Sequence, residues 1–225
     1  AVTVAACSSG ADRPPCRPPA AAGQIGSICG FHGPEDLEYV RRAGLIVVSN
    51  LRLDGAVGEG GGFLAGFEPG EAPTVVRLWP GPSGIPAEPE PALGDPACTV
   101  PPPAEGFSPH GLTSTTVEGD RTMLYVAGHA SAGGSREAIE IFELRGRGND
   151  ASVIWKACIP TAGAIQANDV ALTPDGEGDW QAGHRGEVAR CRSLLRREAI
   201  RVELGAVHLG PVPLERREIS AIERP

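Results

Sequence analysis

The stretch 107–129 constrains the fold more than any other part of the sequence. Pro109 fixes its own φ angle and lacks an amide donor, so it is expected to start a strand and not to lie in the middle of one. Residues 112–117 are rich in Thr and Val, as strands are, and a tight turn and a second apolar strand follow. The sequence therefore predicts a β-hairpin that brings His110, at the start of one strand, beside His129, at the end of the next.

The composition agrees with a chain of short strands. Glycine and proline contribute 31 and 22 of the 225 residues, so turns are frequent and long helices are disfavoured. A formal net charge of −8 excludes the basic footprint of a protein that binds nucleic acid or an anionic membrane through its whole surface. No apolar run is long enough to span a bilayer.

The hairpin belongs to a repeated unit. Pro34 precedes Glu35 as Pro109 precedes His110, and in both places a second apolar strand follows. Two further strand candidates complete each unit, at 62–67 and 74–79 in the first and at 138–144 and 152–156 in the second. Four short antiparallel strands joined by Gly/Pro turns are typical of a propeller blade. A third unit is predicted to begin at 167–176, and the Pro-rich loop 80–103 accounts for the unequal spacing.

The repeat pattern ends after residue 176. Residues 177–225 are rich in Arg, offer no second strand for the third unit, and predict an Arg-rich helix over 187–203. We interpret this tail as foreign to the repeat, from a wrong reading frame or retained non-coding sequence; the alternative is a natural basic appendage that binds a partner. The predicted fold is all-β, a β-propeller of about two blades and the start of a third over 23–176, with an anomalous C-terminal tail.

Residues 1–22 are rich in Ala and Pro and have no hydrophobic periodicity, which indicates a tether. Around Cys7 the tether resembles a bacterial lipoprotein processing site, which implies a signal segment upstream and membrane attachment through a lipidated Cys7. The alternative is an Ala-rich linker with an incidental cysteine. We expect an extracytoplasmic protein that is secreted, periplasmic or lipid-anchored.

The remaining cysteines fit an oxidising compartment. Cys98 and Cys158 each lie shortly before the first strand of a unit, so the two could pair, which leaves Cys16 with Cys29. With Cys7 and Cys191 of the tail set aside, these four cysteines allow three pairings, and free buried thiols are the alternative to any of them.

Several motifs, taken in order, resemble the paraoxonase/arylesterase family, which is related to the gluconolactonase and strictosidine-synthase-like propellers. They are Gly-Pro-Glu-Asp-Leu at 33–37, Phe-Ser-Pro-His-Gly-Leu at 107–112, Leu-Tyr-Val-Ala-Gly-His at 124–129, Ile-Glu-Ile-Phe at 139–142 and Asn-Asp-Val-Ala at 168–171. The resemblance covers roughly 29–176. It implies a six-bladed propeller with two Ca²⁺ ions in its tunnel that hydrolyses lactones and aryl esters.

Oxygen donors occur in pairs at two predicted strand starts, Glu35 with Asp36 and Asn168 with Asp169. Successive side chains of a strand point to opposite faces, so each pair would supply one donor to each of two ions. Such donors suit calcium, which takes six to eight oxygens. The resemblance implies that Glu35 and Asn168 bind the catalytic ion, and that Asp36, Asp169 and the carbonyl of Leu112 bind the structural one. The alternative is that these residues only cap turns.

The resemblance also implies that His110 is the general base that activates water and that His129 supports it. The alternative is a Pro-His-Gly turn and a histidine that merely ends a strand. The family has an asparagine where this chain has Gly128, and no counterpart of the remaining calcium ligands follows Gly176.

Two function hypotheses result. The first is a calcium-dependent hydrolase of a small-molecule ester or lactone, incomplete in this chain. The alternative is a non-catalytic calcium-binding propeller fragment or surface binding module. Neither has a nucleic-acid partner, and the oligomeric state is left open.

Overall fold

The computed structural model describes residues 27–51, 61–70, 72–82, 84–130, 136–161, 166–172, 178–184, 187–193 and 205–206. These residues form three antiparallel four-stranded sheets, each with its strands in chain order. The first sheet contains β1 (Pro34–Val40), β2 (Leu45–Asn50), β3 (Phe63–Phe67) and β4 (Val76–Trp79). The second contains β5 (Phe107–Val117), β6 (Arg121–Ala130), β7 (Ala138–Arg145) and β8 (Ser152–Pro160). The third contains β9 (Ala167–Leu172), β10 (Gly178–His184), β11 (Glu187–Ser193) and the short β12 (Gly205–Ala206).

Three short 3₁₀ turns complete the described elements: η1 (Pro91–Leu93), η2 (Glu118–Asp120) and η3 (Gly148–Asp150). None of the helices in the described part of the chain is long and apolar enough to cross a membrane. The predicted all-β class and the four-stranded units are therefore confirmed. Over the described residues the three sheets do not close into a ring.

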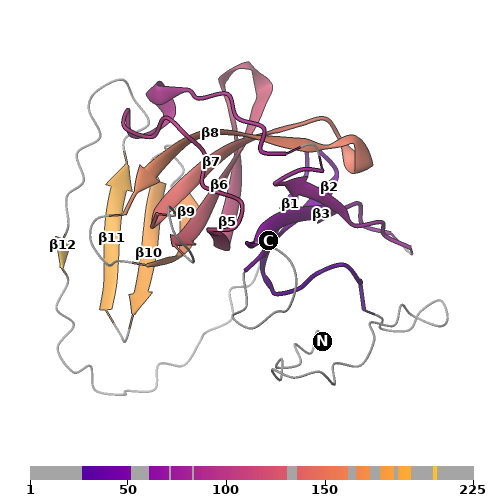
Figure 1. Ribbon diagram of the computed structural model, residues 1–225, viewed down its shortest axis with the longest axis horizontal. Helices are drawn as coiled ribbons and strands as arrows, with labels where there is room; N and C mark the ends of the chain where they lie inside the picture. Colours follow the sequence, from indigo (N-terminus) through magenta and orange to yellow (C-terminus); the bar gives the residue numbers. More distant parts are fainter. Residues whose placement is uncertain are drawn as a thin grey trace, which may run out of the picture.

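The second sheet lies between the first and the third (Figure 1). The first strands of the three sheets are neighbours, because β5 contacts both β1 and β9. Side chains of β6 alternate between two cores: Leu124 and Val126 pack towards the first sheet, whereas Met123 and Tyr125 pack in the cluster that includes Val170 of β9. A strand buried on both faces needs apolar residues at successive positions, and β6 has them.

Three aromatic side chains join the first two sheets. Trp79, Phe107 and Phe142 are fully buried, with ring centroids 4.7 Å apart for Trp79 and Phe107 and 5.2 Å apart for Trp79 and Phe142. Both pairs have the edge-to-face geometry that aromatic quadrupoles favour. This contact fixes β4 and β5 against each other and so holds the hairpin of the second sheet in place.

The prediction that the repeat lacks a second strand after residue 176 is wrong. β10 pairs with both β9 and β11, so the third unit continues into the segment that we interpreted as foreign. The helix predicted over 187–203 is wrong for 187–193, which form β11, and the rest of it lies outside the described residues. The error has a physical cause, since strand formation depends on neighbouring strands as much as on intrinsic propensity.

The Pro-rich loop 80–103 packs beside the second sheet. Part of it lies along β8, where Ala87 and Trp155 form a parallel bridge. The amides of Glu88 and Glu90 donate to the carbonyls of Trp155 and Lys156, at 2.9 and 2.7 Å. The loop therefore follows the outer edge of the second sheet.

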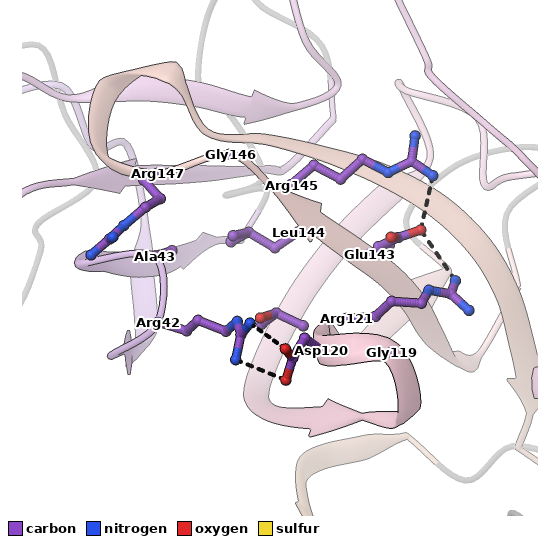
Figure 2. Close-up of a pocket in the computed structure, with 11 residues that line it drawn as sticks. Arg42, Ala43, Gly119, Asp120, Arg121, Glu143, Leu144, Arg145, Gly146 and Arg147 are labelled. Atoms are coloured by element: carbon purple, nitrogen blue, oxygen red, sulfur yellow. Dashed lines mark hydrogen bonds and ion pairs between the residues drawn. The ribbon is translucent and has the colours of Figure 1, made fainter.

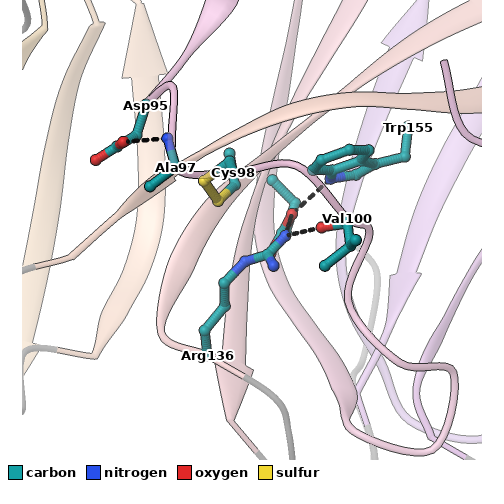
Figure 3. The surroundings of a disulfide bond; sticks show 8 residues. Asp95, Ala97, Cys98, Val100, Arg136 and Trp155 are labelled. Carbon is teal, nitrogen blue, oxygen red and sulfur yellow. Dashed lines mark hydrogen bonds and ion pairs between the residues drawn. A yellow bond between two sulfur atoms is a disulfide. The ribbon is translucent and has the colours of Figure 1, made fainter. Parts of the chain in front are cut away.

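The structure contains the expected disulfide between Cys98 and Cys158, with Cα atoms 5.5 Å apart. It ties the end of this loop to β8, close to the bond that Arg136 donates to the carbonyl of Val100 (Figure 3). Cys29 is also disulfide-bonded. Cys16, its expected partner, lies outside the described residues, as do Cys7 and most of the tether.

A charge network crosses the second sheet at the end where β6 begins. Glu143 of β7 accepts from Arg121 at 3.1 Å, from Arg145 at 3.0 Å and from Lys156 at 3.1 Å. Figure 2 shows Glu143 between the two arginines. The network borders a cavity of about 530 Å³. Lys156 is buried and also contacts Glu88 of the loop at 2.9 Å. The network thus joins three strands to the loop.

Candidate functional site

Each of the three neighbouring first strands has a β-bulge near its start. In β1 the register shifts around Glu35, in β5 it shifts around His110 and Gly111, and in the β9–β10 pair Asn168 is left without a partner. A bulge leaves one residue out of the ladder and redirects its side chain. Glu35, His110 and Asn168 thus occupy equivalent positions in the three sheets.

The first strand of the second sheet departs from prediction in one detail. β5 begins at Phe107, before Pro109, so proline lies inside the strand. The strand tolerates it because the ladder is interrupted directly after Pro109. The same interruption sets the direction of His110.

The hairpin brings the two histidines together as predicted. The rings of His110 and His129 lie 4.0 Å apart between centroids, at an angle of 73°. His129 is opposite Ser108 in the ladder, and His110, two residues further along β5 at the bulge, lies diagonally from it. Proximity is confirmed, whereas the catalytic roles of the two residues stay predictions.

His110 is partly buried and close to two predicted calcium ligands. Its Nδ1 lies 3.7 Å from Oε1 of Glu35 and has no hydrogen-bond partner among the described residues. Burial, and then the nearby His129, lower the pKa of His110 to about 4. A hydrogen bond with Asn168 and the charge of Glu137 oppose this shift without overcoming it. At neutral pH the imidazole is therefore uncharged and able to accept a proton.

The carboxylates of Asp36 and Asp169 lie close enough to Glu35, beside His110, to act on it electrostatically. Burial raises the pKa of Glu35, and the negative charges of Asp36 and Asp169 raise it further. Crowded carboxylates of this kind are stabilised when a cation binds among them. A cation bound at this point would relieve the repulsion at Glu35.

Asp36 is held by backbone amides. Its Oδ2 accepts from the amide of Leu112 and its Oδ1 from the amide of Leu37, both at 2.8 Å. Leu112 therefore presents its amide to Asp36, and the role of its carbonyl as a calcium ligand stays a prediction. Asp169 is held similarly, since its Oδ1 accepts from the amide of Val170 at 2.7 Å.

Gly111 lets β5 and β9 approach each other closely. A Cβ atom at Gly111 would lie 2.6 Å from Cα of Asp169 and 2.7 Å from the carbonyl oxygen of Asn168. A side chain here would push the third sheet away. The glycine thus places Asn168 and Asp169 next to the histidines.

Packing also explains why a glycine occupies position 128. A Cβ at this position would lie 3.2 Å from Cγ of Glu140 and 3.5 Å from the ring of Phe107. The asparagine that the family has there would not fit unless Glu140 moved.

Glu137 is a further residue of the site that no sequence motif predicted. Its Oε2 lies 2.8 Å from Nδ1 of His129, and its Oε1 accepts from the amide of Ala130 at 2.9 Å. The only hint in the sequence was that a glutamate directly precedes the strand that pairs with the strand of His129. Only the register of β6 and β7 makes that position adjacent to the imidazole.

The donors fit calcium in chemistry, although protein side chains alone do not surround an ion. In the described part of the chain, no group of three or more His, Cys, Asp or Glu side chains is placed to hold a metal ion. A cation would rely on Glu35 and Asp169 together with the amide oxygen of Asn168, backbone carbonyls and water. Calcium accepts all of these ligands, whereas zinc favours His and Cys.

Comparison of the chain with protein-family models finds no match, and comparison with the curated proteins finds none either. The paraoxonase/arylesterase resemblance therefore stays a prediction based on the motifs.

Proposed function

We propose that this chain carries the site of a calcium-dependent hydrolase that acts on small-molecule esters or lactones, on part of a propeller. The observation that supports it best is the contact between His110 and His129 beside Glu35 and Asn168. These residues come from all three sheets, and a purely structural role does not require two imidazoles to meet next to crowded carboxylates. The Cys98–Cys158 disulfide supports an extracytoplasmic location for the activity.

The side chains divide the work in this proposal. His110, uncharged at neutral pH, accepts a proton from the attacking water. His129 packs against it and orients its ring, while the negative charge of Glu137 favours the imidazolium that forms. Glu35 and Asn168 provide the oxygens for a cation, which when bound polarises the ester carbonyl and holds the negative charge of the oxyanion. Gly111 keeps the oxygen donors within reach of the bases.

The second candidate is a module that binds calcium without catalysis. The small number of converging ligands among the described residues favours it. An ion held mainly by water binds weakly and positions a substrate poorly. Calcium binding without turnover separates this candidate from the first.

The test combines binding and activity on the full chain. Thermal unfolding is followed during a calcium titration, and hydrolysis of an aryl ester and a lactone is measured with calcium and with chelator. The proposal expects an upward shift of the unfolding temperature with calcium, calcium-dependent hydrolysis, and a loss of about 100-fold or more in kcat for His110→Gln.

His32→Gln is the matched control, because His32 is exposed and its ring packs edge-on against Phe63. It should keep wild-type activity. If calcium raises the unfolding temperature but no hydrolysis is seen, the hydrolase is excluded and the calcium-binding module is retained. If calcium causes no shift and no hydrolysis is seen, both candidates are excluded.

A further inference from the structure

We infer that Glu137 is a positioning residue that fixes the imidazole of His129 with its hydrogen on Nδ1, so that Nε2 keeps its lone pair. This inference deepens the proposed function and rests on it for its catalytic meaning. The observations that carry it are the two hydrogen bonds of the carboxylate and the fixed backbone around it.

The carboxylate of Glu137 uses both oxygens. Oε2 lies 2.8 Å from Nδ1 of His129, and Oε1 accepts the amide of the next residue, Ala130, at 2.9 Å. A carboxylate oxygen can only accept, so Nδ1 must be the nitrogen that carries the hydrogen. Histidine tautomers are commonly set in this way by the partner of one ring nitrogen.

The backbone of Glu137 is held on both sides. Its carbonyl accepts from the amide of Thr161 at 3.0 Å, which ties it to the end of β8. Its neighbour Arg136 donates two bonds of 2.9 Å to the buried carboxylate of Glu140. The backbone on both sides of Glu137 is therefore fixed, and this holds the carboxylate of Glu137 beside His129.

The local sheet geometry explains why a side chain is needed there. The ladder between β6 and β7 ends at the pair of Gly128 and Ala138, so His129 lies just beyond it. Glu137, directly before β7, takes over where the ladder stops. Both side chains are largely buried, with 11% exposure for His129 and 16% for Glu137, so water competes little for this bond.

The consequence lies at the other imidazole. His110 packs against His129 at 4.0 Å, and the negative charge of Glu137 acts on it in the direction that favours a proton. A carboxylate, His129 and His110 thus form a connected series that the motifs did not indicate. The expected effect on catalysis is on kcat, because Glu137 acts through His129.

The test measures the tautomer directly. The full chain is labelled with ¹⁵N-histidine, and two-bond ¹H–¹⁵N correlations identify which ring nitrogen carries the hydrogen; His129→Gln assigns the signal. The wild-type protein should show His129 with hydrogen on Nδ1. Glu137→Ala should shift it towards hydrogen on Nε2, the tautomer that an isolated imidazole side chain prefers, while the signal of His32 stays unchanged.

Wild-type His129 with hydrogen on Nε2 would overturn the inference, and this measurement needs no variant to fold. An unchanged tautomer in a folded Glu137→Ala protein would also overturn it. In the hydrolysis assay, Glu137→Ala should lower kcat about 10- to 100-fold with little change in KM, as loss of a partner that orients a functional histidine does. If the wild-type chain has no hydrolase activity but the tautomer changes as expected, the proposed function fails and the positioning of His129 by Glu137 stands.

Discussion

At the scale of single residues, Gly111 determines the geometry of the site as much as the charged residues do. Gly111 lies in the bulge of β5 and meets Asp169 and the carbonyl of Asn168 from the third sheet. The backbones touch there, so the oxygen donors and the histidines share one small region. The glycine is required for space.

We expect Gly111→Ala to lower the free energy of unfolding by about 1–3 kcal/mol, the usual cost of inserting a methyl group into a filled space. The new Cβ would displace β9 and with it Asn168 and Asp169, so any calcium-induced shift should shrink as well. Urea denaturation with and without calcium measures both effects.

Gly70→Ala is the control for this change, because a Cβ at Gly70 meets no atom within 4 Å. Its effect on stability should be small. Equal stabilities for the two variants would mean that β5 and β9 do not touch as described.

At the scale of elements, the loop beside β8 behaves as an extra strand that a disulfide closes. Backbone bonds join it to Trp155 and Lys156, and the Cys98–Cys158 bond fixes its far end. The two cysteines are 60 residues apart in sequence, so the bond encloses most of the second sheet. Such a bond constrains the unfolded chain strongly.

The double variant Cys98→Ser/Cys158→Ser should therefore lose about 2–4 kcal/mol of unfolding free energy. Hydrogen exchange should show the amides of Glu88, Glu90 and Asp95 opening first, since they bond to β8. An unchanged urea midpoint together with unchanged protection of these amides would contradict the described role of the loop.

The elements that the sequence predicts well are those with local signals. The hairpin of β5 and β6 follows from a proline, a Thr/Val-rich strand and a tight turn, and the meeting of His110 and His129 follows from the hairpin. β10 and β11 lacked such signals, because their strand character comes from pairing with β9. Glu137 was missed for a similar reason, since its contact depends on the register between two strands.

The bulges are another feature that could not be predicted from local sequence signals. The sequence aligned Glu35 with His110, and the structure places both of them, and Asn168 of the third sheet, in bulges. Alternation along a regular strand did not predict that irregularity. A bulge redirects a side chain without any change of residue type, so only the pairing of strands reveals it.

At the scale of the whole molecule, the charge network around Glu143 links β6, β7, β8 and the loop. Burial alone would raise the pKa of Glu143, but the hydrogen bonds from Arg145, Arg121 and Lys156 outweigh it and lower the pKa to about 2 from an ordinary value of 4.5. Because the folded pKa lies below the unfolded one, the unfolded chain binds the proton first. The stabilisation is complete above pH 4.5 and is lost as the pH falls towards 2.

We expect the wild-type protein to lose stability between about pH 5 and pH 2.5, with Glu143 contributing on the order of 2 kcal/mol to the loss. Glu143→Gln should be less stable at neutral pH but should lose less on acidification, because the amide does not titrate. Urea midpoints at several pH values for both proteins give the two slopes. Parallel slopes would contradict the assigned role of Glu143.

The loop along β8 also bears on how copies of this chain can associate. An uncovered outer strand offers a row of amides and carbonyls to which another chain can add, and fibrils grow by this addition. Here Glu88, Glu90 and Asp95 already use the carbonyls of β8, and a covalent bond keeps them in place. Reduction of Cys98–Cys158 would therefore do more than lower stability: it would expose a template for cross-β growth that the oxidised protein keeps covered.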